Sequence, residues 1–259
     1  MSDADARSAD SHHLVSAPDQ HLEASVAAGY DRSVPERFSP EAIEPCVNLL
    51  AELAGAGSAV EFAVGTGRLA LPLSGRGVTV HGIDFSEPML AELKRKPGAD
   101  KVSLTVGDMT ETVVCNDASL VYLAFNTITN LRTQAMQVAC FRNAAAHLSP
   151  DGRFVIENNV PILHRMSPSE TVYAYELTPT HLGFDEYIDM VNQISVSHHY
   201  FIDGDNVRNV AGAFRYVWPS ELDLMAELAG LEFESRWADW HRNEFTGTSR
   251  GHVSVWRKR

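Results

Sequence analysis

The sequence predicts an α/β protein with a doubly wound, mostly parallel sheet and helices on both of its faces. Between residues 58 and 158, short apolar runs typical of buried strands alternate with helical patterns, as they do in parallel sheets. A glycine-rich turn joins the first of these runs to a helix. The chain has 259 residues, of which 44% are hydrophobic and 21% charged, so it is long enough and apolar enough for a large core.

The N-terminal segment, residues 1–17, is predicted to be a disordered tail. It is polar and acidic, contains the pair His12-His13, and has no apolar stretch that resembles a secretory signal. The chain also contains no run of about 18 apolar residues, so no membrane span is expected. These observations predict a cytoplasmic protein that does not associate with a membrane.

Two helices are predicted to form an N-terminal cover over residues 18–57. The first runs from about Asp19 to Ala28, where the following glycine breaks it. The second begins with Ser39 as its N-cap and Pro40 in its first turn, and it ends at Gly55.

Five strands and three helices are then predicted to form the sheet and the layers that cover it. The predicted strands are Ser58–Ala63, Val78–Ile83, Val102–Val106, Ser119–Ala124 and Gly152–Glu157. The predicted helices are Arg68–Ser74, Ser86–Lys96 and Thr133–His147. Helices that follow strands in this way place a helix on each crossover of a parallel sheet.

The pattern changes after Asn158. Residues 159–190 lack a clear period and are predicted to be irregular. An antiparallel hairpin follows, with Asp203-Gly204 as the turn between the alternating segments Ile194–Ile202 and Val207–Val217. The C-terminal elements are predicted at Ser220–Ala229 as a helix and at Leu231–Ala238 and His252–Trp256 as strands. Residues 18–259 are thus expected to form a single domain with a core over 58–158, an insertion over 159–218 and closing elements over 219–259.

Charge and cysteine content restrict the possible partners. The chain has 21 basic and 34 acidic residues, a formal net charge of −13, whereas binding to a nucleic-acid backbone relies on a surplus of Lys and Arg. Cys46, Cys115 and Cys140 are widely spaced and form no Cys-x-x-Cys pair, so neither a disulfide framework nor a metal site is expected. A monomer and a homodimer are both compatible with the sequence.

The glycine-rich turn carries the strongest functional signal. Gly65 and Gly67 let a ligand approach the main chain closely, and the helix that follows presents free N–H groups to an anion. Together with Ala70, this spacing is compatible with the dinucleotide-binding fingerprint of Rossmann-like folds, and Asp84 follows at the end of the second strand. A tight strand-to-helix turn without a ligand produces the same short pattern.

Three carboxylates define the ligand more closely. Glu61 lies within the first strand, Asp84 ends the second, and Asp108 follows the third. Because the carboxyl ends of parallel strands meet at one edge of the sheet, these three groups are expected to share a site. They favour a ligand with ammonium and hydroxyl donors over a pyrophosphate. A cofactor with a sulfonium, an α-ammonium, a ribose and an adenine fits this requirement.

At this point the sequence resembles a known family, the class I S-adenosylmethionine-dependent methyltransferases of the small-molecule type. The resemblance covers residues 58–158 and depends on motifs that occur in the family's order. These are Glu-Phe-Ala-Val-Gly-Thr-Gly-Arg from Glu61, Gly-Ile-Asp-Phe-Ser-Glu-Pro-Met-Leu from Gly82, Gly-Asp-Met from Gly107, Leu-Ala-Phe-Asn from Leu123, and Leu-Ser-Pro-Asp-Gly from Leu148. In the last motif Asp151 replaces the usual first glycine.

The resemblance implies roles for individual residues in binding S-adenosylmethionine. Glu61, Ala63, Gly65 and Gly67 would hold the methionine moiety, and Asp84 would hold the ribose. The expected adenine side consists of Phe85, Met89, Gly107, Asp108 and Met109, and the expected sulfonium side consists of Ala124 and Phe125. Tyr30 resembles the tyrosine of a Tyr-Asp pair that helps to close this site. Ordinary packing remains the alternative for Tyr30, Phe85 and Met89.

The candidates for a catalytic base lie outside these motifs. A base is needed only if the methyl acceptor must lose a proton. His198 and His199 titrate near neutrality when unperturbed, and they point to opposite faces of one predicted strand, so only one of them can face a pocket. Either histidine can equally be a packed or surface residue. Further candidates on the acceptor side are Asn126, Asn130, Glu157, His164, His181 and Tyr187.

The leading hypothesis is methyl transfer from S-adenosylmethionine to an oxygen or nitrogen of a small molecule, with secondary metabolism as a candidate setting. The segment after the fourth strand supports a small acceptor, because it lacks the Asn-Pro-Pro-Tyr sequence that enzymes of this resemblance often use to methylate amino groups of nucleic acids and proteins. Two alternatives stay open. One is a nicotinamide-dependent oxidoreductase that uses the same glycine turn, and the other is a methyltransferase-like fold that has been adapted to another role.

Overall fold

The computed structural model describes residues 24–259, so the predicted tail and its His12-His13 pair lie outside the described residues. The chain forms two compact units, and each is described by itself. The larger unit contains residues 24–128, 135–160 and 219–259, and the smaller contains residues 129–134 and 161–218. Among the described residues, no helix is long and apolar enough to cross a membrane.

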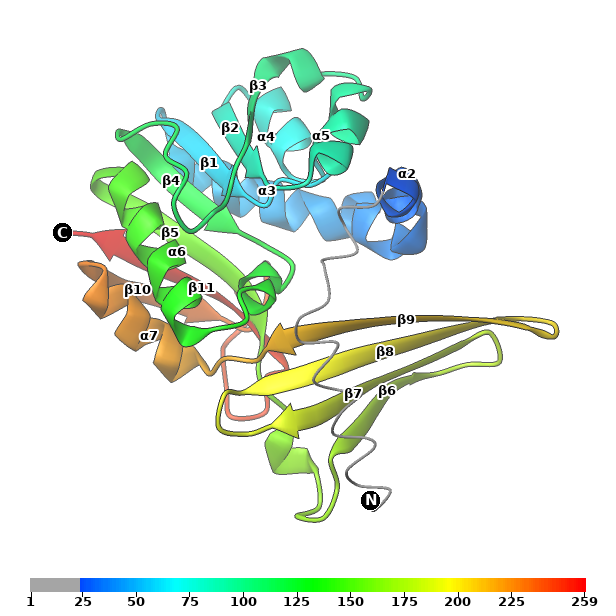
Figure 1. Cartoon of the computed structure of the whole chain (residues 1–259). Coiled ribbons are helices and arrows are strands. Elements are labelled where there is room, and N and C mark those ends of the chain that lie inside the picture. The colour runs from blue at the N-terminus through cyan, green and yellow to red at the C-terminus, as the bar shows by residue number, and fades with distance from the viewer. Residues whose placement is uncertain (1–23) are drawn as a thin grey trace. The chain divides into compact units, whose positions relative to one another are not determined.

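The larger unit is built on a seven-stranded sheet in the order β10-β11-β5-β4-β1-β2-β3 (Figure 1). Five strands are parallel: β1 (Ser58–Phe62), β2 (Thr79–Asp84), β3 (Val102–Val106), β4 (Ala118–Leu123) and β5 (Leu148–Asn159). The antiparallel strands β11 (Gly251–Lys258) and β10 (Leu231–Trp237) extend the sheet beyond β5. The predicted doubly wound, mostly parallel sheet is confirmed.

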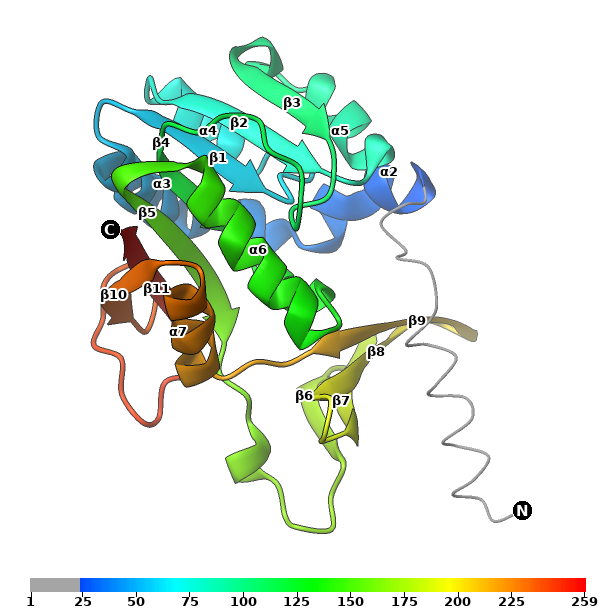
Figure 2. The same ribbon diagram turned by 60° about the vertical axis from the view of Figure 1, so that its left-hand side comes forward.

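Helices cover both faces of this sheet. One face packs against α3 (Pro40–Ala54), α4 (Ala70–Gly75) and α5 (Glu87–Lys94). On the other face lie α6 (Gln134–His147) and α7 (Pro219–Leu228), which Figure 2 shows side by side. Phe141 of α6 meets the ring of Trp256 at 5.3 Å, and the indole Nε1 of Trp256 donates to Asp223 of α7 at 2.9 Å. Short 3-10 turns lie at Ala99–Lys101 (η3) and Thr127–Asn130 (η4).

The N-terminal helices agree only partly with the prediction. Ser39 caps α3 as expected, because its Oγ accepts a hydrogen bond from Ala42 N at 3.3 Å. The preceding helix, α2 (Ala24–Ser33), however, continues through Gly29, and a 3-10 turn, η2 (Pro35–Phe38), follows it. The predicted break at Gly29 is therefore wrong. A glycine inside a helix costs only about 1 kcal/mol, which contacts of the residues beyond it can offset.

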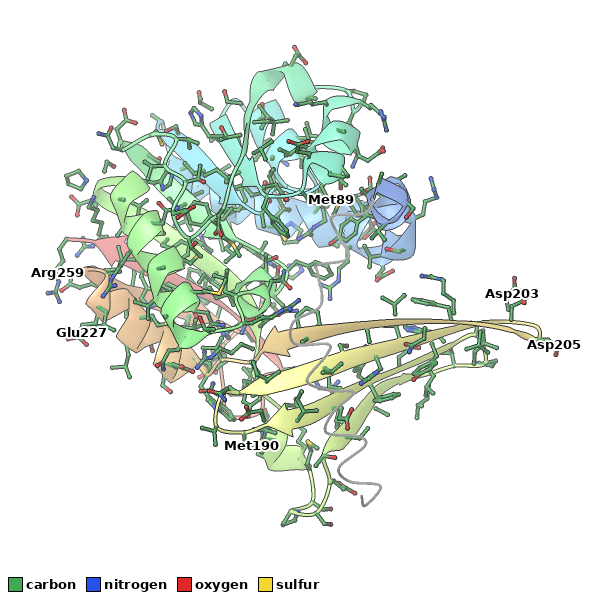
Figure 3. The ribbon with its side chains drawn as sticks, viewed as in Figure 1. Met89, Met190, Asp203, Asp205, Glu227 and Arg259 are labelled. Carbon is green, nitrogen blue, oxygen red and sulfur yellow. The ribbon has the colours of Figure 1, made fainter. Side chains whose placement is uncertain are left out.

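The smaller unit is a four-stranded antiparallel sheet in the order β6-β7-β8-β9. Its strands are β6 (Val172–Leu177), β7 (His181–Asp189), β8 (Ile194–Asp203) and β9 (Asn206–Arg215), and a short 3-10 turn, η5 (Leu163–Arg165), precedes them. The predicted β8–β9 hairpin is confirmed, with Gly204 at φ +58° in its loop, and Figure 3 labels Asp203 and Asp205 at its tip.

The prediction that residues 159–190 are irregular is wrong, because two of the four strands lie there. Both strands carry interruptions that hide the alternation of strand residues. The register shifts between Ala174 and Glu176 on β6 and between Tyr187 and Asp189 on β7, so the side-chain alternation changes phase at each irregularity.

Candidate active site

The turn after β1 is held in a conformation that favours glycine. Gly65 has φ +54° and Gly67 has φ +84°. A β-carbon on Gly67 would lie 2.8 Å from Leu93 Cγ, so this glycine allows α5 to pack against the turn. A β-carbon on Gly65 would meet nothing closer than about 4.0 Å, where Met89 Cε is one of the two nearest atoms. A side chain at position 65 is therefore disfavoured by the backbone conformation and not by a close neighbour.

Asp84 at the end of β2 fixes this turn by two short hydrogen bonds from main-chain amides. Its Oδ2 accepts from Gly65 N at 2.7 Å, and its Oδ1 accepts from Ser86 N at 2.8 Å. The side chain is only 6% exposed. A carboxylate held in this way is a fixed hydrogen-bond acceptor beside the glycine turn.

Glu61 supplies a second buried carboxyl group on the neighbouring strand. It is 5% exposed, and the hydroxyl of Tyr122, which is its paired residue on β4, donates to its Oε2 at 2.9 Å. Burial raises the pKa of Glu61 to about 8, against the opposing effects of the Tyr122 hydrogen bond and the charge of Arg68. In the ligand-free protein this group is therefore protonated at neutral pH, and a bound cation would favour its ionised form.

Tyr30 brings α2 into the same site. Burial is the main cause that raises the pKa of Tyr30, and the charges of Arg68, Asp31, Asp84 and Arg37 also act on its hydroxyl. The structure thus groups this predicted residue with Asp84, which lies on a different element. The sequence did not point to Arg37.

Phe125 lies beneath these two arginines. The guanidinium carbon of Arg37 is 4.6 Å from the centroid of the Phe125 ring, and that of Arg68 is 5.6 Å from it. The charge of Arg68 also acts on Glu61. Arg68 follows the glycine turn directly, which was a signal in the sequence, whereas nothing in the local sequence of Arg37 indicates this contact.

A strained turn positions Phe125 at the carboxyl end of β4. Phe125 and Asn126 both have left-handed backbones, with φ +60° and φ +59°. Glu157 holds them, because its Oε2 accepts from Phe125 N at 2.8 Å and its carbonyl accepts from Asn126 N at 3.2 Å. Asn126 Oδ1 in turn accepts from Asn159 N at 2.6 Å. Glu157 and Asn126, both predicted on the acceptor side, therefore also shape the site.

The residues predicted for the adenine side lie at the ends of β2 and β3. Met89 is buried, whereas Phe85 is 44% exposed. The loop after β3 is held by Asn143, whose Nδ2 donates to the carbonyl of Met109 at 3.0 Å.

Asp108, the acidic residue of that loop, accepts hydrogen bonds within the loop itself. Asp108 Oδ1 accepts from the main-chain N and the hydroxyl of Thr110, both at 2.7 Å. At Gly107, a β-carbon would lie 2.4 Å from Thr112 Oγ1, so the loop requires glycine there.

In the smaller unit, His199 lies in a cluster of hydrogen-bonding side chains. Its Nε2 is 3.0 Å from the Tyr175 hydroxyl, and its Nδ1 is 3.0 Å from His181 Nε2. The Tyr175 hydroxyl is also 2.9 Å from Ser197 Oγ. Burial, followed by the charges of His181 and His198, lowers the pKa of His199, so its imidazole is neutral at pH 7.

A glycine makes this cluster possible. Gly183 pairs with His199, and a β-carbon on Gly183 would lie 2.5 Å from Tyr175 Cε2. The Tyr175 ring therefore crosses β7 over the one position that lacks a side chain. Tyr175 lies in the segment predicted to be irregular, so its position beside His199 could not be predicted.

The remaining predicted residues have other neighbours. His198 stacks on Phe184, with ring centroids 4.8 Å apart, and its Nε2 lies 3.4 Å from Glu186 Oε2. Tyr187 is buried against Tyr216, and burial raises the pKa of its hydroxyl. His164 Nε2 accepts from Arg165 Nε at 3.3 Å on η5, and Asn130 ends η4 within the smaller unit.

Comparisons with known proteins agree with this geometry. A family model described as a methyltransferase domain matches residues 59–152. Among curated proteins, a dTDP-3-amino-3,6-dideoxy-alpha-D-glucopyranose N,N-dimethyltransferase of Streptomyces fradiae is 36% identical over 102 residues, 39% of each chain. The chain thus spans less than two fifths of the length of the curated relatives it matches.

Similarity to solved structures extends over most of the chain. The CcbJ methyltransferase from Streptomyces caelestis is 36% identical with a TM-score of 0.75, over 83% of this chain and 88% of that one. An S-adenosylmethionine-bound amino pentose methyltransferase, CalS10 from Micromonospora echinaspora, has the same fold at 21% identity, with a TM-score of 0.67 over 89% and 96% of the two chains. The match to CcbJ spans most of both proteins, and the cofactor motifs of the family occur in this chain in the family's order. The chain therefore belongs to the class I S-adenosylmethionine-dependent methyltransferases.

Proposed function

We propose that this enzyme transfers the methyl group of S-adenosylmethionine to the nitrogen of a small-molecule amine. The observation that carries the proposal is the pair of buried carboxyl groups near the glycine turn, Glu61 on β1 and Asp84 at the end of β2. The choice of nitrogen is supported by the Streptomyces fradiae relative, whose name states dimethylation of an amino sugar nucleotide. An amino sugar or a related amine is therefore the first acceptor class to examine.

The residues of the larger unit suit the proposed cofactor. The sulfonium of S-adenosylmethionine supplies an electrophilic methyl group. Glu61 would face the α-ammonium, and Asp84 would accept from the ribose hydroxyls beside the main chain of Gly65. Met89 and Phe85 would line the adenine, with Asp108 accepting from its exocyclic amine. The ring of Phe125 would lie beside the sulfonium, where an aromatic face stabilises a cation.

The proposed proton acceptor is His199. After methyl transfer, the amine nitrogen of the acceptor would carry a positive charge until it loses a proton. His199 accepts this proton in the proposal, because its imidazole is neutral at pH 7 and its second nitrogen lies 3.0 Å from His181. The Tyr175 hydroxyl, which also lies 2.9 Å from Ser197 Oγ, holds the imidazole in one orientation.

The test combines cofactor binding with acceptor screening. Isothermal titration should first show binding of S-adenosylmethionine. The enzyme is then incubated with a methyl-labelled cofactor and a panel of amino sugars, amino sugar nucleotides and their hydroxyl analogues, and mass spectrometry locates the added methyl group. We expect the label on the amine nitrogen. A label on a hydroxyl of the analogues, or tight cofactor binding with no labelled product from any panel member, would overturn the proposal.

A further inference from the structure

We propose that Asp31, Thr66 and Lys96 form a latch that fastens helix α2 across the glycine turn and controls how fast the cofactor leaves. In this proposal Asp31 is a positioning residue that acts through its neighbour Tyr30. The inference depends on the cofactor of the family and not on the identity of the methyl acceptor.

The latch joins three elements that are distant in the sequence. Asp31 of α2 accepts a hydrogen bond from Thr66 Oγ1 at 2.6 Å through its Oδ1. Its Oδ2 accepts from Lys96 Nζ, just beyond the end of α5. Lys96 Nζ also donates to the carbonyl of Thr66 at 2.8 Å, which closes a ring of three residues. Thr66 is the residue between Gly65 and Gly67, so the ring is attached directly to the ligand-binding turn.

The ring is partly shielded from solvent. Thr66 is 3% exposed, and the ring of Phe38 covers Lys96, with the Nζ atom 5.3 Å from its centroid. The side chains of Lys96 and Asp31 are 27% and 35% exposed. An ion pair at this depth is weaker than a fully buried one and is sensitive to salt, which suits a contact that must open and close.

The latch explains why α2 continues beyond Gly29. Tyr30, Asp31 and Ser33 all lie past this weak point of the helix, and Ser33 Oγ donates to the carbonyl of Tyr30 at 2.7 Å. Asp31 anchors this last turn of the helix to Thr66 and Lys96. Without the anchor, we expect the segment after Gly29 to fray.

Fraying would expose the cofactor side of the site. Tyr30 is adjacent to Asp31, and its hydroxyl lies within the electrostatic reach of Asp84 and Arg68, both of which belong to the cofactor site. The latch therefore holds Tyr30 against that site while the cofactor is bound. Cofactor release requires this turn of α2 to move, so breaking the latch should speed dissociation more than it changes overall stability.

The experiment measures cofactor release from the full-length enzyme by rapid filtration, with methyl-labelled S-adenosylmethionine bound first and an excess of unlabelled S-adenosylmethionine added as the chase. Asp31→Asn and Lys96→Met should each raise the dissociation rate by about five- to tenfold, while the melting temperature changes little. Asp31→Glu, which keeps the charge, should restore most of the slow release. Glu36→Gln removes a nearby exposed carboxylate with no role in the ring and should behave like the wild type.

Salt provides a test that needs no variant. Raising the ionic strength should speed release from the wild-type enzyme towards the rate of Asp31→Asn, and it should affect the variant much less. Equal dissociation rates for Asp31→Asn and Glu36→Gln would overturn the proposal, as would an unchanged release rate of the wild type in high salt. Failure of the wild type to bind S-adenosylmethionine at all would instead contradict the cofactor assignment.

Discussion

The two units of this enzyme fix their functional groups by different means. In the larger unit, main-chain amides hold the carboxylates: Gly65 N bonds to Asp84, and Phe125 N bonds to Glu157. In the smaller unit, side chains hold each other, as Tyr175 and His181 do with His199. A group that main-chain amides hold keeps its position when neighbouring side chains are substituted. In a cluster of side chains, one substitution changes the position of the others. The cofactor site is thus built into the fold, and the proposed acceptor site is open to variation.

The strongest test of the backbone-held site removes Asp84. Asp84→Ala should weaken S-adenosylmethionine binding by roughly 1000-fold, about 4 kcal/mol, because it removes the ribose acceptor and leaves the amides of Gly65 and Ser86 unpaired. Isothermal titration measures the loss, and circular dichroism checks that the variant is folded. Glu87→Gln, which changes a carboxylate on the neighbouring helix, is the matched control. A dissociation constant within threefold of the wild type would contradict the role of Asp84.

The corresponding test of the smaller unit removes His199. His199→Phe should lower kcat by about 100-fold, the usual size of a general-base effect, and should leave the dissociation constant of the cofactor unchanged. His198→Phe is the natural control, because His198 lies on the opposite face of the same strand against Phe184. Steady-state kinetics with a saturating acceptor distinguishes the two variants. If both lose the same activity, the histidine cluster has only a packing role.

The pH dependence of cofactor binding tests the cofactor site separately from the histidine cluster. The pKa of Glu61 is about 8 in the ligand-free enzyme, and a cationic cofactor favours the ionised form. Affinity for S-adenosylmethionine should therefore rise about fivefold from pH 7 to pH 8 and about tenfold in all before it levels off above pH 9, with close to one proton released per cofactor bound at pH 7. Titrations in buffers of different ionisation enthalpy count this proton. Glu61→Gln should bind weakly at every pH, and a wild-type affinity that does not change with pH would rule out the linkage.

The raised pKa of Glu61 also predicts how the free energy of unfolding depends on pH. The folded state keeps the proton of Glu61 up to about pH 8, whereas an unperturbed glutamate loses it near 4.5. Between these values the folded state binds more protons, so the contribution of this group to the free energy of unfolding falls as pH rises. Denaturant unfolding should show Glu61→Gln gaining on the wild type between pH 5 and pH 8. A constant difference between the two proteins would contradict the raised pKa.

The smallest expected effect concerns the backbone of the glycine turn. Ala63 has φ +51°, a conformation that strains any residue with a β-carbon. Ala63→Gly should relieve this strain and raise the free energy of unfolding by up to about 1 kcal/mol, partly offset by the greater freedom of glycine in the unfolded chain. Thermal unfolding with and without the cofactor measures the change. A clear loss of stability would show that the turn is not strained at this position.

The two units also differ in how much of them could be predicted. Periodic apolar runs located each element of the parallel sheet to within a few residues, because buried strands and capped helices carry local signals such as Ser39 and Ser86. The glycine turn, Glu61 and Asp84 were recognisable because they occur in motifs along one stretch of chain. Strands β6 and β7 were missed because bulges and Gly183 disturb their alternation.

Contacts between distant residues could not be predicted in the same way. Asp31 meets Thr66 and Lys96 across 35 and 65 residues of sequence, and the motifs in which Asp31 and Thr66 occur do not indicate that these residues contact each other. Arg37 reaches Phe125 in a similar manner. Local patterns report how a residue is buried within its own element, whereas the partner of a polar side chain depends on the tertiary fold.

Gly183 has a consequence for how such an enzyme changes its acceptor during evolution. Because the Tyr175 ring occupies the space above it, any larger residue at position 183 displaces that ring and uncovers His199. A single nucleotide change is enough to convert a glycine codon into one for serine or alanine. We expect this position to act as a mutational switch that gives access to new acceptors in one step, while selection for cofactor use on the other unit remains undisturbed.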